Sequence, residues 1–342
     1  ECYDHLLLEH EVEKQAHVVA AQLKEKEISK IIFIGGNRFN EDGPLLSFID
    51  ICKNRGIDVE VISDKERINY PSATMGTLAE CLKKNGINFS SVDKLTIDTL
   101  IKYKDESTLV FCINCKWILS REMIELFPGR VFNYHNSALP EQRGAACHSW
   151  RLMQNINFTR LTIHEVSPEI DKGKVYLQEK VMFDDLVNSP AQSYSFIASR
   201  ESELLSNFLD GNVKITFQDE HDSFYWPRLS THINGFIDWS WTANEIVSFC
   251  NAFDNPFDGA STYLSNSKVH FHNVIKINES FSFHPFQAGL IYRINDSEVY
   301  IAARKGGICV KDLKADKSNK IRVGLRFVTP PEILFSALIT TT

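Results

Sequence analysis

The chain has 342 residues, of which 43% are hydrophobic and 24% are charged, and its formal net charge at pH 7 is −7. This composition is typical of a globular protein, and the length favours two domains. It excludes a membrane-spanning helix, because no apolar run approaches ~20 residues, and it argues against a dedicated nucleic-acid-binding protein, which is usually basic.

The N-terminus and the cysteines indicate the cellular compartment. The first residues lack a basic segment followed by an apolar one, so we expect no secretory signal and a cytoplasmic location. Most of the eight cysteines lie in apolar runs, which is typical of buried reduced thiols. Cys112 and Cys115 form a C-x-x-C pair with no second pair nearby. We interpret this pair as structural, with zinc binding and redox activity as weaker alternatives.

Short apolar strands alternate with helices through the first half of the chain. Residues 1–30 come first and predict an added amphipathic helix, because their apolar residues have helical spacing. The alternation that follows predicts an α/β fold with a Rossmann-like, doubly wound parallel sheet. The predicted strands are Ile31–Ile34, Val59–Ile62, Thr108–Ile113 and Val131–His135, and the predicted helices are Pro44–Asn54, Thr77–Lys84 and Arg121–Phe127.

The pattern changes after Gly211. A long helix over Ala191–Leu209 precedes the change, and Thr242 with Glu245 forms a predicted capping box at the start of a helix to Phe253. Five short strands then recur between turn residues, which predicts a small OB-like β-barrel. The predicted domains are a helical extension (1–30), a catalytic domain (31–212), a linker (213–241) and a C-terminal OB-like β domain (242–342).

Two polar side chains interrupt the apolar strand Val131–His135. Asn133 and His135 alternate with Phe132 and Tyr134, so both point to one side of the sheet, with Cα atoms roughly 6.6 Å apart. They lie at the carboxyl end of a parallel strand, where open α/β sheets place their sites. Burying both costs free energy unless they are hydrogen-bonded or used in chemistry.

The residues after this strand add a turn, a cation and a carboxylate. Pro140 ends the strand because it cannot donate to a ladder. Arg143 precedes a glycine, and Asp171 lies in a loop two residues before Gly173. Each residue alone is a weak signal, because a single strand histidine is usually a core residue and an aspartate near glycine is usually a turn residue. Only their joint order and spacing indicate a functional site.

This order resembles the folate-dependent formyltransferase family, which includes glycinamide ribonucleotide, methionyl-tRNA and aminosugar formyltransferases. The family pattern is N-x-H-x-S-x-L-P-x-x-R-G, then T-G-x-T-x-H, then seven residues to D-x-G. Two departures are Arg160, where the family usually has glycine, and Cys147, where many members have proline. The resemblance extends over about residues 31–330. The matching residues are Asn133, His135, Ser137, Leu139, Pro140, Arg143, Gly144, Thr159, Thr162, His164, Asp171 and Gly173.

The resemblance implies a chemistry. The formyl donor would be N10-formyltetrahydrofolate, the acceptor a primary amine, and no metal would take part. Asn133 and His135 would stabilise the negative charge on the formyl oxygen, and a donor of this kind is typically worth ~2.7–4 kcal/mol. An imidazole, whose usual pKa lies near ~6.5, suits proton transfer at neutral pH. Asp171 would orient or charge-balance His135.

The resemblance also implies binding residues. His164 and Thr162 would support the catalytic residues from behind. The folate would lie against Cys115, Lys116, Trp117, Ile118, Leu119, Leu139 and Asp171. The amine substrate would contact Gly35, Gly36, Asn37, Arg38, Ser137, Arg143 and Gly144.

Several amines and two other functions remain open. The acidic charge favours a UDP- or dTDP-linked amino-dideoxy sugar for surface glycan biosynthesis over initiator tRNA, although the basic stretch Arg304–Arg326 keeps methionyl-tRNA as an alternative. The glycinamide nucleotide ranks last, because it usually goes with a shorter chain. A non-catalytic nucleotide- or nucleic-acid-binding module is the rival from another class. A dinucleotide oxidoreductase is disfavoured, because the first strand lacks G-x-G-x-x-G.

The expected partner is therefore a small nucleotide sugar, with no nucleic acid and no membrane, and a homodimer stays open. Five aromatic side chains could stack on its base or sugar, although core packing explains each of them as well. These residues are Trp117, Tyr134, Trp150, Tyr225 and Trp226.

Overall fold

The computed structural model describes residues 18–25, 27–37, 43–71, 76–279, 282–315 and 321–339. The chain forms two compact units with interleaved segments. The first unit comprises Glu1–Arg143, Thr159–Val181 and Ile197–Tyr225, and the second comprises Gly144–Phe158, Met182–Phe196 and Trp226–Thr342. Among the described residues, no helix is both long enough and apolar enough to cross a membrane.

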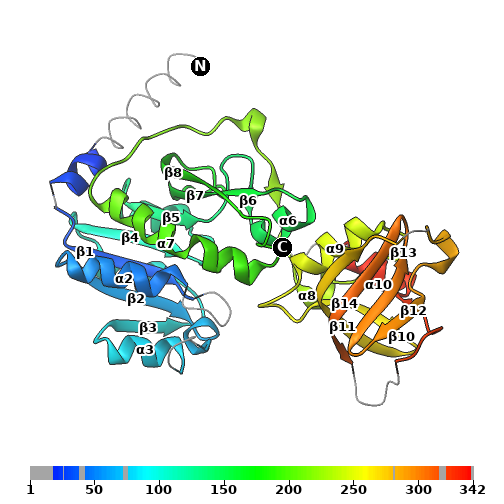
Figure 1. The fold of residues 1–342 in the computed structure, drawn as a ribbon. Helices are drawn as coiled ribbons and strands as arrows, with labels where there is room; N and C mark the ends of the chain where they lie inside the picture. The colour runs from blue at the N-terminus through cyan, green and yellow to red at the C-terminus, as the bar shows by residue number, and fades with distance from the viewer. Residues whose placement is uncertain are drawn as a thin grey trace. The chain divides into compact units, whose positions relative to one another are not determined.

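A seven-stranded sheet forms the centre of the first unit (Figure 1), in the order β3-β2-β1-β4-β5-β7-β8. Strands β1 to β5 run parallel to one another, as predicted. Strand β7, however, runs antiparallel to β5, so the sheet is mixed and the prediction of a parallel sheet is wrong at this edge. The strands are β1 Lys30–Gly35, β2 Asp58–Asp64, β3 Asn88–Val92, β4 Thr108–Ile113, β5 Val131–His135, β7 Phe158–Glu165 and β8 Val175–Met182.

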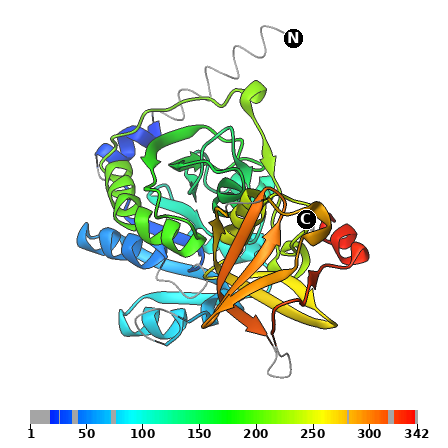
Figure 2. The same ribbon diagram turned by 45° about the vertical axis from the view of Figure 1, so that its right-hand side comes forward.

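Aromatic residues cover one face of this sheet. Phe111 and Phe132 pack edge-to-face on Phe208 of α7, and Phe111 also packs on Phe48 of α2. Helix α2 spans Pro44–Asn54, as predicted, and α7 spans Pro190–Leu209 (Figure 1, Figure 2). Tyr134 shares this face: it packs on Phe48 and its hydroxyl donates to Glu201 at 2.7 Å, so core packing explains it. Side chains alternate along a strand, so Asn133 and His135 point to the opposite face.

Short helices lie along the rest of the first unit. Thr77 caps α3 through a capping box with Glu80, and Ser120 caps α5. The remaining elements were not predicted, or are shorter than predicted, because their apolar pattern is brief. These helices are α3 Leu78–Lys84, α4 Ile97–Leu100 and α5 Arg121–Ile124, with 3-10 turns η1 Arg67–Asn69, η2 Ile101–Tyr103 and η3 Glu220–Asp222. Residues 18–24 are also helical.

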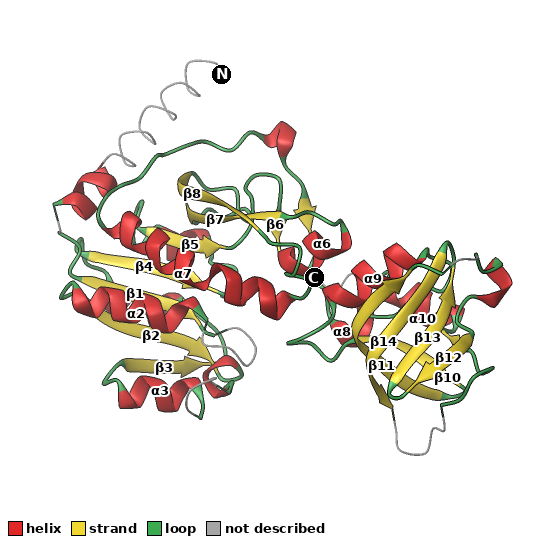
Figure 3. Ribbon diagram, in the orientation of Figure 1, coloured by secondary structure: helices red, strands yellow, loops and turns green. Residues whose placement is uncertain are grey.

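The second unit holds a six-stranded antiparallel sheet (Figure 3), in the order β12-β13-β14-β11-β10-β15. A bridge between Leu290 and Arg326 joins the segments that precede the two edge strands. The predicted capping box of Thr242 and Glu245 at the start of α9 is confirmed. The strands are β10 Ala260–Leu264, β11 Ser267–Ile277, β12 Ile291–Asn295, β13 Glu298–Ala303, β14 Gly306–Ala315 and β15 Phe327–Val328. The helices are α6 Cys147–Met153, α8 Thr231–Asn234, α9 Ala243–Ala252 and α10 Pro331–Ala337, with a 3-10 turn η4 Pro285–Gln287.

Two further short strands, β6 Arg143–Gly144 and β9 Tyr225–Trp226, pair with each other. The cysteines that the structure describes are free thiols, and most of them are buried, as the sequence predicts.

Candidate active site

Three neighbouring strands place polar side chains in one row. Cys112 on β4 is paired with Asn133 on β5, and Asn133 is paired with His164 on β7. Asn133 Nδ2 lies 3.0 Å from His164 Nε2. His164 Nδ1 lies 2.9 Å from the carbonyl oxygen of Glu165, which can only accept, so Nδ1 donates and Nε2 receives the hydrogen bond from the amide. The antiparallel direction of β7 therefore brings His164 against Asn133.

His135 is held by a backbone carbonyl. Its Nε2 donates to the carbonyl oxygen of Gln142 at 2.7 Å, and the residue is only 8% exposed. Its other nitrogen, Nδ1, lies 3.9 Å from Asp171 Oδ2. Because Nε2 is committed to Gln142, Nδ1 is the nitrogen that faces the carboxylate.

Asp171 comes from the loop between β7 and β8 and lies between two imidazoles. Its Oδ1 is 3.4 Å from His164 Nε2, and its Oδ2 is the oxygen nearest to His135. The rings of the two histidines are nearly perpendicular, with centroids 6.2 Å apart. The structure thus brings together an amide, two imidazoles and a carboxylate from three separate segments. Such a set can donate hydrogen bonds to a developing oxyanion and carry a proton.

The loop after β5 is shaped by hydrogen bonds from two strands. Thr162 Oγ1 donates to the carbonyl oxygen of Ser137 at 2.8 Å. Gln178 Nε2 donates to Thr162 Oγ1 at 3.0 Å and to the carbonyl oxygen of Leu139 at 3.2 Å. The Ser137 hydroxyl donates to the side chain of Gln142. Ser137, Leu139 and Thr162 therefore fix the loop that carries Gln142 beneath His135.

Two arginines of the motif lie in ion pairs. Arg160, where the family usually has glycine, pairs with Glu141 at 2.7 Å. Arg143 is buried and pairs with Glu220 at 2.9 Å, and the hydrogen bond from Arg143 lowers the pKa of Glu220. Gly144 follows it with a left-handed φ of 102°, which favours glycine.

The segment expected to bind the folate follows β4. Leu119 is buried in the apolar cluster beside α4 and α5, whereas Ile118 is 72% exposed. Lys116 Nζ lies 3.2 Å from Asp64 Oδ1 and above the ring of Trp117. Burial raises the pKa of Asp64, but hydrogen bonds from Arg67 and Lys116 outweigh it and lower that pKa to about 2. This segment is thus tied to the end of β2 by a charge cluster.

Cys115 starts this segment and partners Cys112. A hydrogen bond between the two thiols raises the pKa of Cys112 and lowers that of Cys115. The Cys115 thiol also approaches the carbonyl oxygen of Trp117 at 3.4 Å. These contacts agree with a structural pair.

The end of β1 holds the residues expected to contact the amine substrate. A Cβ on Gly35 would lie 1.9 Å from the carbonyl oxygen of Ile113, so only glycine fits there. Asn37 is fully buried, and within the described part of the chain neither its side-chain nitrogen nor its oxygen has a hydrogen-bond partner. Its carbonyl oxygen accepts from Asn114 Nδ2 at 2.9 Å. Arg38 lies outside the described residues.

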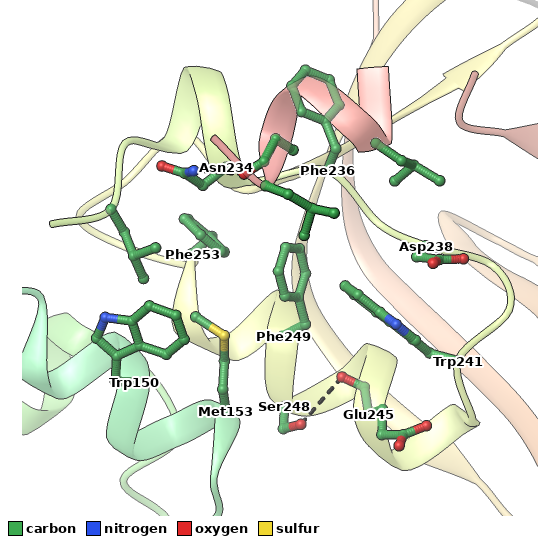
Figure 4. A pocket seen from close by; sticks show the side chains of 14 residues that line it. Trp150, Met153, Asn234, Phe236, Asp238, Trp241, Glu245, Ser248, Phe249 and Phe253 are labelled. Carbon is green, nitrogen blue, oxygen red and sulfur yellow. Dashed lines mark hydrogen bonds between the residues drawn. The ribbon is translucent and has the colours of Figure 1, made fainter. Parts of the chain in front are cut away.

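The second unit contains an apolar pocket of about 410 Å³ (Figure 4). Trp150 and Met153 of α6, Phe249 of α9 and Leu334 of α10 line it. The Trp150 indole donates to the carbonyl oxygen of Pro227 at 2.8 Å, so Trp150 is a packing residue of this unit. None of the predicted catalytic residues lines this pocket.

Sequence reasoning missed three glutamines around the site. Gln142 holds His135, Gln178 holds the loop after β5, and Gln218 contacts the Asp171 loop. Gln142 lies inside the quoted motif, so the sequence could have indicated it. The other two lie on distant segments and carry no local pattern.

Solved structures share this fold at low sequence identity. The sugar 3N-formyl transferase WlaRD, solved with dTDP and 5-N-formyl-THF, has a TM-score of 0.60 and 22% identity over 86% of this chain and 99% of its own. An N-formyltransferase from Helicobacter canadensis, solved with folinic acid and dTDP-3-aminofucose, has a TM-score of 0.60 and 18% identity over 82% and 98%. HypX from Aquifex aeolicus, solved with tetrahydrofolic acid, has a TM-score of 0.55 and 18% identity over 86% of this chain and 45% of its own.

The sequence itself matches two family models. Residues 230–324 match the formyl transferase C-terminal domain. Residues 30–209, more than half of the chain, match the formyl transferase domain, and this range includes every motif residue from Asn133 to Asp171. The chain therefore belongs to the formyl transferase family.

Proposed function

We propose that the protein transfers a formyl group from N10-formyltetrahydrofolate to the primary amine of a nucleotide-linked amino-dideoxy sugar, for surface glycan biosynthesis. The observation that carries this proposal is the approach of Asn133, His135 and Asp171 to one place at the carboxyl end of β5. The residues present fit such a donor, because the amide and the imidazole can both donate to one oxygen. When bound, the folate supplies the formyl carbon that a neutral amine attacks, with charge developing on the formyl oxygen.

The geometry assigns proton positions to the chain's own residues. His135 keeps a proton on Nε2 for the carbonyl oxygen of Gln142, so the proton that is gained or lost sits on Nδ1. Protonated Nδ1 donates to the oxyanion together with Asn133 Nδ2. The carboxylate of Asp171 stabilises the imidazolium and can take the proton that the amine loses. The same proton must reach the leaving nitrogen, which balances the reaction.

Two observations support a nucleotide sugar as the acceptor. Two of the similar structures were solved with dTDP or a dTDP-linked aminosugar. The buried amide of Asn37, at the end of β1, has no partner among the residues that the structure describes, and a buried polar group without a partner costs about 1–3 kcal/mol. We infer that a polar group of the substrate meets it, together with Gly35, Gly36, Arg38, Ser137, Arg143 and Gly144. The folate is proposed to lie against the segment from Cys115 to Leu119, with Leu139.

The proposal extends to the domain organisation, the oligomeric state and the location of the protein. The domain limits are 1–30, 31–212, 213–241 and 242–342. An OB-like arrangement of the C-terminal domain is supported by its antiparallel sheet and by the Leu290–Arg326 bridge. We also propose that the protein forms a homodimer and is located in the cytoplasm.

An amine screen tests the function. The protein is incubated with N10-formyltetrahydrofolate and, separately, with pools of aminosugar nucleotides and with charged initiator tRNA. We expect one aminosugar nucleotide to gain the mass of one formyl group. Formylation of the tRNA alone would replace this proposal with the methionyl-tRNA alternative. A folded protein that binds folate and formylates neither pool would support a binding module instead.

A further inference from the structure

We propose that Gln218 is a positioning residue: it ties the backbone of the Asp171 loop to Arg143 and thereby sets the distance between the Asp171 carboxylate and His135. The effect on turnover rests on the proposed function, but the effect on His135 does not.

Gln218 uses its whole amide in this contact. Its Nε2 donates to the carbonyl oxygens of Asp171 and Gly173, both at 2.7 Å. Its Oε1 accepts from Arg143 Nε at 3.1 Å and from Arg143 Nη2 at 3.0 Å. An amide group offers two donors and two acceptor positions, so all four are filled. Gln218 is therefore a cross-link between two loops rather than a surface side chain.

The Asp171 loop needs such a cross-link. Asp171 has a φ of 53°, a left-handed conformation that costs free energy for a residue other than glycine. At Gly173 a Cβ would lie 1.7 Å from the carbonyl oxygen of Glu165, so the loop runs tightly against the end of β7. The two hydrogen bonds from Gln218 fix the direction of both carbonyl groups in this turn, and with them the direction in which the Asp171 side chain leaves the backbone.

The other end of the cross-link is Arg143, which follows Gln142, the residue that holds His135. Gln142 binds His135 Nε2 through its carbonyl oxygen, and Arg143 follows in the chain. The His135 imidazole and the loop that carries the Asp171 carboxylate are thus both held by contacts to the adjacent residues 142 and 143. Arg143 is itself fixed, because it is buried and paired with Glu220, which also pairs with Lys172 at 3.5 Å.

The position of the carboxylate controls the charge state of His135. Two titratable groups that face its ring are Asp171, with Oδ2 at 3.9 Å, and His164, with its ring centroid at 6.2 Å. A nearby carboxylate favours the protonated imidazole. If the loop relaxes and Asp171 moves away, His135 loses this stabilisation and titrates at a lower pH. Beyond Gln218, the charges of Arg143 and Lys172 are balanced by those of Glu220 and Glu169.

The test replaces Gln218 with methionine, which keeps the length of the side chain but removes all four hydrogen bonds. We expect kcat to fall about 10–100-fold, because small misplacements of a catalytic group cost up to ~10²-fold, with KM for both substrates within threefold. The NMR titration midpoint of His135 should fall by about half a pH unit or more. Gln192→Met is the control. The Gln192 side chain also bonds to the backbone, accepting from Asn188 N at 2.9 Å, but it lies at the start of α7, and this variant should leave both values unchanged.

A double variant tests whether Gln218 acts on His135 through Asp171. In an Asp171→Asn background, Gln218→Met should cause no further change in the His135 midpoint, because the carboxylate is already gone. An unchanged midpoint in the single variant, or an equal shift in both backgrounds, would overturn the proposal. This titration needs no turnover, so the result is independent of the formyl transfer itself.

Gln218→Glu carries the test if the methionine variant does not fold. Its carboxylate still accepts from Arg143 but cannot donate to the two carbonyl oxygens, so we expect kcat to fall here as well. A kcat equal to that of the unmodified protein would show that the loop does not depend on Gln218.

Discussion

Two histidine–aspartate pairs, one in each unit, differ in the distance between the imidazole and the carboxylate. In the second unit His272 Nδ1 lies 2.7 Å from Asp254 Oδ1, and its Nε2 lies 2.9 Å from the carbonyl oxygen of Asp258. Asp254 also accepts from the backbone of Asn255 and Asn273. In the first unit the shortest distance from His135 to Asp171 is 3.9 Å.

The difference separates a structural pair from one suited to chemistry. The His272 and Asp254 side chains are 0% and 7% exposed, and their polar atoms are committed to each other and to the backbone. Burial raises the pKa of Asp254, but the hydrogen bonds from His272 and the backbone outweigh it and lower that pKa. The side chains of His135 and Asp171 are 9% and 13% exposed and lie beyond hydrogen-bond distance of each other, so a substrate group can bind between them.

The largest effect should come from removing His135. We expect His135→Ala to lower kcat at least ~10³-fold, because it removes both an oxyanion donor and the proton carrier. Folate affinity, measured by titration calorimetry, should stay within about tenfold. Turnover close to that of the unmodified protein would remove His135 from the mechanism.

Asp171→Asn should slow the reaction about 10²-fold. The amide cannot stabilise the imidazolium, but the fold keeps the loop because Gln218 contacts only its backbone. Steady-state kinetics should show a lower kcat and an unchanged KM for the sugar nucleotide. If kcat stays the same, Asp171 is a turn residue.

The same exchange in the second unit should affect stability. Asp254→Asn leaves a buried imidazole without its carboxylate, and breaking a buried pair typically costs about 3–5 kcal/mol. Urea unfolding measures this loss in the free energy of unfolding. A loss below about 1 kcal/mol would contradict the assignment of the pair as structural, and Asp258→Asn, at an exposed side chain, is the matched control.

A smaller effect concerns Asp64, which pairs with two cations. Its pKa of about 2 in the folded protein lies below the usual 3.8. A lowered pKa adds stability that is present above about pH 4 and is lost as the pH falls toward 2. After screening by solvent this amounts to about 1–2 kcal/mol. Asp64→Asn should therefore be less stable than the unmodified protein at pH 6, and the difference should shrink at pH 2.5; a constant difference would contradict the lowered pKa.

The sequence predicts much of the local structure, including the strand end and the loop that carry the candidate site residues. Helix α2 and strand β4 have their predicted ends, because an N-terminal proline marks the helix and a continuous apolar run marks the strand. The motif placed Asn133, His135 and Asp171 on a strand end and a loop, and the structure brings them together.

Features that depend on tertiary contacts could not be predicted from the sequence. The antiparallel direction of β7 was missed, because an apolar strand carries no sign of its direction, and this direction sets His164 beside Asn133. Gln218 was missed because its partners lie 45 or more residues away. The His272–Asp254 pair shows the same limit: nothing in the sequence distinguishes a histidine and an aspartate at hydrogen-bond distance from a pair that lies farther apart.

The most direct test of the central claim is the mass of an aminosugar nucleotide after incubation with N10-formyltetrahydrofolate and either the unmodified protein or His135→Ala. We expect the gain of one formyl group with the unmodified protein and none above background with the variant. Equal formylation by both proteins would contradict it, because the amide, imidazole and carboxylate at the end of β5 would then not be the groups that transfer the formyl carbon.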